Sequence, residues 1–113
     1  MMNRTTRYAL FAILAIGLTA CSQEPPEIRI RNDRATKANL QLKTSGGSTV
    51  NINDVAPGQL TNYQEVAEGR VEATASIQNE SVSPTTTFDA VKDEKYTVVV
   101  ATGNPPTLRV EKN

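Results

Sequence analysis

Apolar and polar residues alternate with a period of two in the later part of the chain, and this pattern constrains the fold more than any other feature. The clearest example is the stretch 70–78, in which Val71, Ala73, Ala75 and Ile77 alternate with polar or charged residues. Successive side chains of a β-strand point to opposite faces, so the pattern predicts a strand with one buried face. The small alanines of this stretch favour the close approach of a facing sheet.

Other short stretches predict further strands at a spacing of roughly ten residues. The stretch 59–64 has a weak pattern, so we expect a bulge or an edge strand there. Pro84 cannot donate a hydrogen bond to a neighbouring strand, which predicts an edge position for 82–88. The stretch 95–102 is apolar on both sides, and such strands lie at the centre of a sheet or between layers. The remaining predicted strands are 28–31, 38–43, 50–52 and 108–113, and the predicted turns include Asn32, Gly46, Pro57, Gly69, Asn79 and Gly103.

Together, these seven or eight strands predict an all-β fold. The expected architecture is an antiparallel sandwich of the immunoglobulin-like or transthyretin-like type, formed by residues 28–113. A domain of about ninety residues buries roughly 60 to 65% of the surface that its unfolded chain exposes. We therefore expect it to fold without a disulfide bond, and the chain contains a single cysteine.

The first residues have the composition of an export signal. Residues 1–7 contain Arg4 and Arg7 and no acidic residue, and residues 8–18 are apolar apart from the hydroxyl group of Tyr8. This apolar run is much shorter than the ~20 residues that a helix needs to cross the hydrocarbon core of a membrane. The pattern predicts a cleaved signal helix over residues 1–20 and not a permanent membrane span.

The residues Leu18, Thr19, Ala20 and Cys21 resemble the lipobox of bacterial lipoproteins. In proteins with this motif the leader is removed before the cysteine, and the lipid on the cysteine anchors the mature chain. The resemblance implies that Cys21 is lipidated and that residues 21–27 comprise this cysteine and a tether. The alternative is ordinary secretion after cleavage near Ala20, which leaves Cys21 as a free thiol in an oxidising compartment.

The predicted location is the bacterial cell envelope, where the lipid holds the domain close to a membrane. Ser22, and not aspartate, follows the cysteine, which indicates the periplasmic face of the outer membrane if the host is Gram-negative. Pro25 and Pro26 favour an extended tether of ~3.1 Å per residue, with a reach of roughly 20 Å. We therefore expect the domain to act near its membrane.

The composition excludes several classes of function. Without Arg4 and Arg7, the mature chain has ten Lys and Arg against twelve Asp and Glu, and it lacks the clustered cations that bind nucleic acid. Because the chain has no histidine and only one cysteine, the usual zinc, copper and haem sites lack ligands. Ser-His-Asp and Cys-His catalysis lack their base for the same reason. We expect neither enzymatic activity nor a metal or other cofactor.

Two groups of residues are candidate ligand sites, and each has a simpler explanation. Asp89, Asp93 and Glu94 lie near the hydroxyl groups of residues 85–87, and an acidic loop of this kind is able to bind calcium. A solvated turn explains the same residues, because the residue order of a known calcium loop is absent. Tyr63 is a candidate for stacking on a sugar or a peptide, and the alternative is a ring packed at a sheet edge with its hydroxyl group in water.

Three stretches carry a further resemblance: 28–32 (Ile-Arg-Ile-Arg-Asn), 68–73 (Glu-Gly-Arg-Val-Glu-Ala) and 95–100 (Lys-Tyr-Thr-Val-Val-Val). Together they resemble a recurring β-sandwich domain of bacterial envelope lipoproteins and, more distantly, the periplasmic accessory protein of alginate acetylation. Before Lys95, this chain has Asp93-Glu94 where the family usually places a glycine. The resemblance implies a sandwich fold and an envelope setting, and it implies no catalytic residue.

The predicted function is that of a membrane-anchored, non-enzymatic structural or protein-interaction module of the bacterial cell envelope. Its expected partners are the membrane, through the lipid on Cys21, and an envelope protein bound at an exposed strand edge. The alternative is a small carbohydrate-binding module that recognises an envelope or secreted polysaccharide through Tyr63. We expect no nucleic-acid partner.

Overall fold

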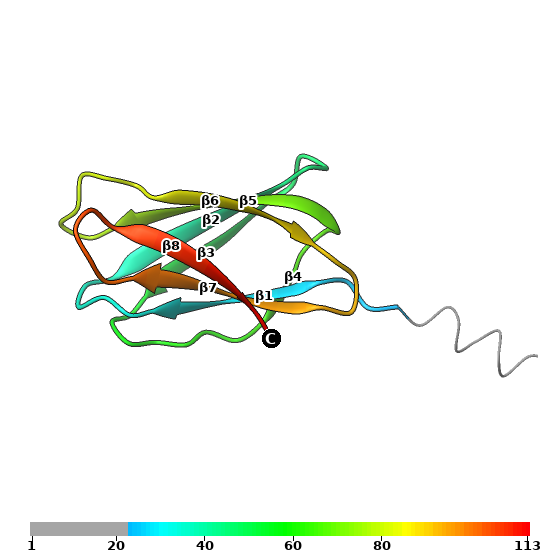
Figure 1. Cartoon of the computed structure of the whole chain (residues 1–113), viewed down its shortest axis with the longest axis horizontal. Coiled ribbons are helices and arrows are strands. Elements are labelled where there is room, and N and C mark those ends of the chain that lie inside the picture. Colours follow the sequence, from blue (N-terminus) through cyan, green and yellow to red (C-terminus); the bar gives the residue numbers. More distant parts are fainter. Residues whose placement is uncertain (1–22) are drawn as a thin grey trace, which may run out of the picture.

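The computed structural model describes residues 23–113, which form a sandwich of two four-stranded sheets (Figure 1). This confirms the predicted all-β fold. The described residues include no helix that is long and apolar enough to span a membrane. The strands are β1 (Glu27–Asn32), β2 (Ala38–Thr44), β3 (Thr49–Val55), β4 (Gln64–Glu65), β5 (Gly69–Ile77), β6 (Thr85–Ala90), β7 (Lys95–Ala101) and β8 (Thr107–Lys112).

The two sheets have the strand orders β4-β1-β7-β8, called sheet A, and β3-β2-β5-β6, called sheet B. Strand pairs are antiparallel except β1 and β7, which run parallel from Glu27 beside Lys95 to Asn32 beside Val100. Both strands therefore start at the same end of the sandwich, where the N-terminal segment enters (Figure 1, right). The antiparallel sandwich is thus confirmed with one parallel pair inside it.

The core lies between the inward faces of the two sheets. Ala73 and Ala75 of β5 are fully buried, in agreement with the expected close approach of a facing sheet. β7 lies between β1 and β8, which confirms that the stretch apolar on both sides is central. The buried apolar side chains of this core are Ile28, Ile30, Ala38, Leu40, Leu42, Val55, Val66, Val71, Ala73, Ala75, Ile77, Ala90, Tyr96, Val98 and Val100.

The predicted strand 59–64 is wrong in its extent, although its edge position is confirmed. β4 contains only Gln64 and Glu65, which pair with the start of β1. Upstream of β4, the N–H of Thr61 donates to the carbonyl of Ile30 at 2.9 Å, but the N–H of Ile30 donates to the Thr61 hydroxyl at 3.0 Å. A side chain here replaces a backbone acceptor, so the segment follows the edge of β1 without continuing a regular ladder.

The predicted strand 82–88 begins and ends later than expected. β6 starts at Thr85, directly after Pro84, and runs to Ala90 at the edge of sheet B. Pro84 has no N–H, but its carbonyl accepts a hydrogen bond from the N–H of Ala75 at 3.0 Å. The proline therefore marks the beginning of the strand, and the predicted edge position is confirmed.

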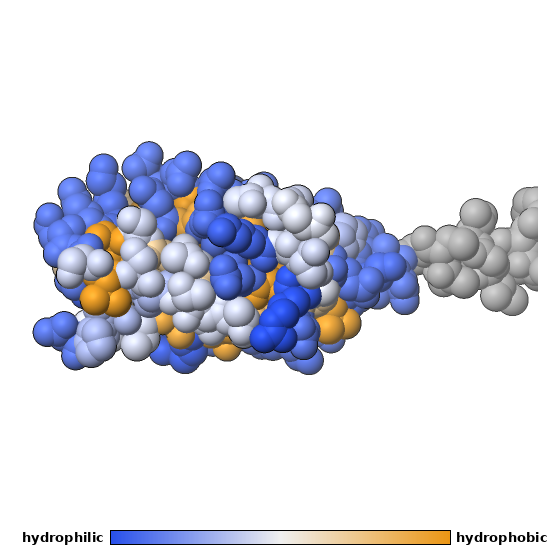
Figure 2. Space-filling view, turned by 90° about the horizontal axis from the view of Figure 1, so that it is seen from above, coloured by the Kyte–Doolittle hydropathy of each residue, from blue (hydrophilic) through white to orange (hydrophobic). Residues whose placement is uncertain are grey.

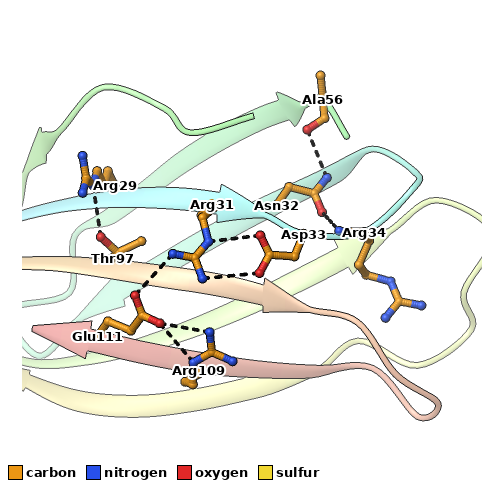
Figure 3. Close-up of polar contacts among 9 residues, drawn as sticks. All are labelled: Arg29, Arg31, Asn32, Asp33, Arg34, Ala56, Thr97, Arg109 and Glu111. Carbon is orange, nitrogen blue, oxygen red and sulfur yellow. Dashed lines mark hydrogen bonds and ion pairs between the residues drawn. The ribbon is translucent and has the colours of Figure 1, made fainter. Parts of the chain in front are cut away.

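Asn32, which the sequence assigns to a turn, is instead the last residue of β1 and is fully buried. Its side-chain amide donates to the carbonyls of Thr36 at 2.8 Å, Val55 at 3.1 Å and Ala56 at 3.3 Å. Its side-chain oxygen accepts a hydrogen bond from the N–H of Arg34 at 3.0 Å (Figure 3). A polar residue can be buried here because it forms hydrogen bonds with backbone groups of three segments that meet at this point.

Candidate functional site

The predicted lipobox, Leu18 to Cys21, lies outside the described residues, so lipidation of Cys21 stays a prediction. The chain makes its first contact with the sandwich a few residues after this cysteine. Glu24 is already hydrogen-bonded to the domain. Only Ser22 and Gln23 separate Glu24 from Cys21, which corresponds to about 10 Å of extended chain.

Residues 24–27, which the sequence assigns to the tether, are bound to the sandwich. The N–H of Glu24 donates to Oδ1 of Asp93 at 2.8 Å, and the N–H of Asp93 donates to the carbonyl of Glu24 at 3.0 Å. Pro26 is fully buried, and its carbonyl accepts a hydrogen bond from the N–H of Val66 at 3.0 Å. These contacts fix the direction in which the chain leaves the domain toward Cys21.

Asp93 has a backbone conformation that is usual for glycine. Its φ is 66°, in the left-handed region that few residues other than glycine adopt. Aspartate is one of the few other residues that adopt this conformation, because its short side chain makes local hydrogen bonds.

The three carboxylates considered as calcium ligands have different neighbours. Asp89 lies beside Arg70 across β5 and β6, Asp93 holds Glu24, and Glu94 lies 3.7 Å from Nζ of Lys112. Within residues 23–113, no group of three or more carboxylate, histidine or cysteine side chains is placed to hold a metal ion. This arrangement favours the solvated turn.

Tyr63 is half-buried over the outer face of sheet A. The centroid of its ring lies 4.7 Å from Cζ of Arg29 and 4.9 Å from Nζ of Lys95. Its hydroxyl accepts a hydrogen bond from Nδ2 of Asn113 at 2.9 Å. Asn113 also donates to the Thr97 hydroxyl at 2.8 Å, and Arg29 donates to the same hydroxyl at 3.0 Å, as Figure 3 shows for Arg29. The ring thus fastens the segment before β4 to sheet A, which agrees better with a packed ring than with an open stacking platform.

A network of charges covers the rest of this face (Figure 3). Arg31 binds Asp33 at 3.0 Å and Glu111 at 3.4 Å, and Arg109 binds Glu111 at 2.9 Å. The hydrogen bond from Arg109, with the charge of Arg31, lowers the pKa of the Glu111 carboxyl below its ordinary value. Val99 lies between Arg31 and Arg109 in the register and is fully buried, so the arginine side chains cover it.

The outer face of sheet B is different, because uncharged polar residues occupy its centre. One row crosses all four strands, with Asn51 beside Gln41, Gln41 beside Thr74, and Thr74 beside Thr85. A shallow hollow of about 210 Å³ lies on this face, which is smaller than the roughly 300–1,000 Å³ of typical ligand pockets. Its lining residues are Asn39, Leu40, Gln41, Asn51, Asn53, Thr74 and Ser76.

A second hollow, of about 230 Å³, lies where the N-terminal segment meets the turn before β7. Two of its carboxylates are engaged, since Glu27 lies 3.5 Å from Nζ of Lys95 and Asp93 accepts the N–H of Glu24. This hollow is also below the usual size of a small-molecule site.

Within residues 23–113, large apolar side chains are exposed singly and not as a patch. Leu60, Val82 and Val91 are about half exposed, and each lies in a different connection between strands. Figure 2, which views the sandwich from above, shows a mostly hydrophilic surface with apolar atoms only in small, separate spots. Single exposed apolar residues are normal, so they do not mark a docking site.

The edge strands of the two sheets differ in their protection against pairing. β4 is only two residues long, β6 follows Pro84, and β8 carries Arg109, Glu111 and Lys112. Short strands, prolines and charges all keep an edge from pairing with another chain. Residues 49–53 of β3, Thr-Val-Asn-Ile-Asn, contain neither proline nor charge.

The β2–β3 hairpin determines which backbone groups of β3 point outward. At the turn, the N–H of Thr44 donates to the carbonyl of Ser48 at 3.0 Å. Hydrogen-bonded and non-hydrogen-bonded pairs alternate along an antiparallel ladder. In the observed register, the next residues of β3 that exchange bonds with β2 are therefore Val50 and Ile52.

Thr49 and Asn51 consequently direct their N–H and C=O groups away from β2, toward solvent. Their side chains are exposed on the outer face, whereas Val50 and Ile52 are partly buried and pack against the core. The regular ladder ends at a bulge near Asp54, which has a φ of 56°. Residues 49–53 form the segment that we call the open edge.

The described chain is thus a small all-β sandwich with an unprotected sheet edge. No protein-family model and no curated protein matches the chain. Among solved structures, it is similar to a protein from Eubacterium rectale determined by NMR, with a TM-score of 0.59 and 13% sequence identity. The match covers 82% of this chain and 92% of that chain, and at this identity it shows the fold alone. The resemblance to envelope lipoprotein domains and to the alginate acetylation accessory protein stays a prediction.

Sequence reasoning did not single out the open edge or the buried Asn32. A signal for the open edge existed, because residues 49–53 contain neither charge nor proline. This signal could not be interpreted without the strand order, because the backbone N–H and C=O groups of a central strand are bonded on both sides whatever its charge.

Proposed function

We propose that this protein is a membrane-anchored, non-enzymatic interaction module of the bacterial cell envelope, and that it binds an extended, uncharged segment of a protein partner at the open edge. The observation that carries the proposal is the absence of charge and proline in residues 49–53 at the edge of a sheet. In strand addition, main-chain hydrogen bonds hold the partner strand, and alternate side chains set specificity.

The chemistry of the open edge suits this mode of binding. The outward N–H and C=O groups of Thr49 and Asn51 supply the main-chain bonds, each with a net value of about 0.5 to 1.5 kcal/mol. Val50 and Ile52 are partly buried on the core side, so apolar side chains of an added strand would cover them. The partner is therefore expected to present apolar residues at alternate positions.

The proposed anchor strengthens such a weak contact. A lipid on Cys21 confines the protein to a surface and raises its effective concentration near envelope partners. Because the chain is bound to the domain from Glu24 onward, the sandwich would stay within about 10 Å of the lipidated residue. The end that carries Asp93 would then face the membrane.

In-cell photo-cross-linking tests the proposal with the full chain. A photoreactive amino acid replaces Asn51 at the open edge in one variant and Thr85 in a matched control, because both are exposed in the same row of sheet B. We expect a defined cross-linked product from position 51 and none from position 85. Equal products from both positions, or none from either, would rule out binding at the open edge.

A second candidate function is a carbohydrate-binding module, and the uncharged outer face of sheet B favours it. Amides and hydroxyls such as those of Gln41, Asn51 and Thr74 are suited to hydrogen-bond sugar hydroxyl groups. Retardation in polysaccharide affinity gels tests it with Gln41→Ala and Tyr63→Ala. Loss of retardation in Gln41→Ala alone would place the sugar on sheet B, and loss in Tyr63→Ala would place it on sheet A. A wild-type chain that migrates unchanged in all gels would remove this candidate.

A further inference from the structure

We propose that the strand bound at the open edge is β3 of a second copy of this chain, paired antiparallel about a two-fold axis that passes through Asn51. This inference rests on the proposed strand addition and names its partner. The two four-stranded copies of sheet B would then form one continuous eight-stranded sheet. A two-fold interface uses the same surface on both subunits, so that surface must be complementary to itself.

The open edge meets this condition in the register centred on Asn51. Asn51 lies opposite Asn51 of the second copy, Val50 lies opposite Ile52, and Thr49 lies opposite Asn53. The axis is perpendicular to the sheet, so the inward face of one copy continues the inward face of the other. Partly buried Val50 and Ile52 therefore meet apolar residues, and the exposed amides meet amides or hydroxyls.

The backbone selects the same register. Asn51 directs its N–H and C=O away from β2, so two opposed copies of Asn51 form a bonded pair with two reciprocal hydrogen bonds. A register centred on Ile52 would place Val50 opposite Asp54, at the bulge with a φ of 56°. A register centred on Val50 would place Asn53 opposite Gly47, which lies in the hairpin turn. Only the Asn51 register keeps the pairing within residues 49–53.

The other edges oppose such self-pairing. In β8, Lys112 lies on the same face as Leu108 and Val110, so two-fold pairing about Val110 would place a lysine opposite a leucine. Arg109 and Glu111 of β8 already bind each other within one chain. β4 offers two residues, and β6 begins only after Pro84. The open edge therefore differs from β4 and β8 in carrying no charged residue, and from β6 in having no proline directly before it.

The contact is narrow, because only residues 49–53 of each copy pair. Stable interfaces bury roughly 1,200–2,000 Å², and a single strand pair provides less. We therefore expect association at the membrane, where a lipid anchor raises the effective concentration, and weak association in dilute solution.

Oxidative cross-linking of the full chain in intact cells tests the pairing. In an antiparallel bonded pair the Cα atoms lie about 5.5 Å apart, within the range of about 4.4–6.8 Å that disulfide bonds span. We expect Asn51→Cys to give a disulfide-linked dimer. The matched control Thr85→Cys and the unsubstituted chain, which retains Cys21, should give none.

A second experiment tests the register. Thr49→Cys and Asn53→Cys, each expressed alone, should give no dimer, whereas co-expression of the two differently tagged variants should give the mixed dimer. Dimers from Thr49→Cys alone, or equal dimers from Thr85→Cys and Asn51→Cys, would overturn the proposed pairing. A position-51 photo-cross-link to a different protein, without an Asn51→Cys dimer, would overturn the second copy and leave strand addition standing. The absence of both products would overturn both proposals.

Discussion

At the scale of single residues, the buried side chain of Asn32 connects three segments of the fold by hydrogen bonds. Its amide reaches the carbonyls of Thr36, Val55 and Ala56, and it accepts the N–H of Arg34. These groups come from the loop after β1, the end of β3 and the turn that follows β3. Among the described residues, every buried side-chain nitrogen and oxygen has a hydrogen-bond partner. Removing the Asn32 amide would leave buried backbone groups without partners, which is costly in a low-dielectric interior.

We expect Asn32→Leu to lower the free energy of unfolding by about 3 to 5 kcal/mol, because buried carbonyls and the Arg34 N–H lose their partners while the volume is kept. Chemical denaturation of the full chain measures this loss. The control is Asn62→Leu at an exposed position, for which a change within about 0.5 kcal/mol is expected. Equal losses in both variants would show that burial of the Asn32 amide has no special role.

Glu111 makes the free energy of unfolding depend on pH. The hydrogen bond from Arg109 and the charge of Arg31 lower its pKa in the folded chain. Folding therefore favours the ionised carboxylate, so its stabilising contribution is present above the unfolded pKa and is lost as the pH falls through the folded pKa. Because the side chain is about 38% exposed, the effect is screened by salt.

We expect the wild-type chain to lose more stability than Glu111→Gln when the pH falls from about 6 to about 3. Denaturation midpoints measured across this range give the two slopes, and their difference isolates Glu111 from the other carboxylates. The difference should shrink in high salt. Identical slopes at low salt would contradict a lowered pKa for this group.

At the scale of elements, β3 differs from its neighbours because one of its sides is bonded and the other is free. Val50 and Ile52 exchange bonds with β2, and Thr49 and Asn51 face outward. A proline at an outward position removes a donor that no residue of the same chain uses. The same substitution one residue earlier removes a donor of the ladder.

We expect Asn51→Pro to change the free energy of unfolding by less than about 1 kcal/mol, and Val50→Pro to lower it by about 1 to 3 kcal/mol. Asn51→Pro should also abolish pairing at the open edge, because the reciprocal N–H donors are missing. Chemical denaturation and cross-linking with the Thr49→Cys and Asn53→Cys pair measure the two effects. A large loss of stability in Asn51→Pro would mean that its N–H is bonded to β2.

At the scale of the whole molecule, the N-terminal contacts relate the sandwich to its proposed anchor. Glu24 and Asp93 exchange hydrogen bonds, and Pro26 is buried, so the chain leaves the domain at one defined end. With two residues between Glu24 and Cys21, the domain has little freedom to move away from a lipid on that cysteine.

We expect labelling with a radioactive fatty acid to depend on Cys21. The variant Cys21→Ala should lose the label and remain uncleaved, whereas the control Ser22→Ala should retain the label. Growth with the labelled fatty acid, followed by immunoprecipitation of the tagged full chain, measures this. Equal labelling of Cys21→Ala and the wild-type chain would refute the anchor.

Local patterns predicted most of the strands because a strand with one buried face alternates with a period of two whatever its neighbours are. β2, β5 and β7 lie where the alternation placed them, and Pro84 correctly indicated an edge. The strand predicted over 59–64 was wrong in its extent because the Thr61 side chain replaces a backbone acceptor, and composition does not reveal such a contact. The contacts of Tyr63 with Arg29 and Lys95 were not predictable, because they join residues far apart in the chain.

The sequence by itself determined the all-β class, because periodicity is a local property, and the N-terminal signal stays a prediction. The strand order was decided only in the tertiary structure, including the parallel β1–β7 pair and the edge position of β3. Strand order depends on contacts between distant residues, each too weak to recognise in the sequence. At the centre of a sheet, the backbone groups of residues 49–53 would be bonded on both sides. At the edge, those of Thr49 and Asn51 have no partner strand within the described chain.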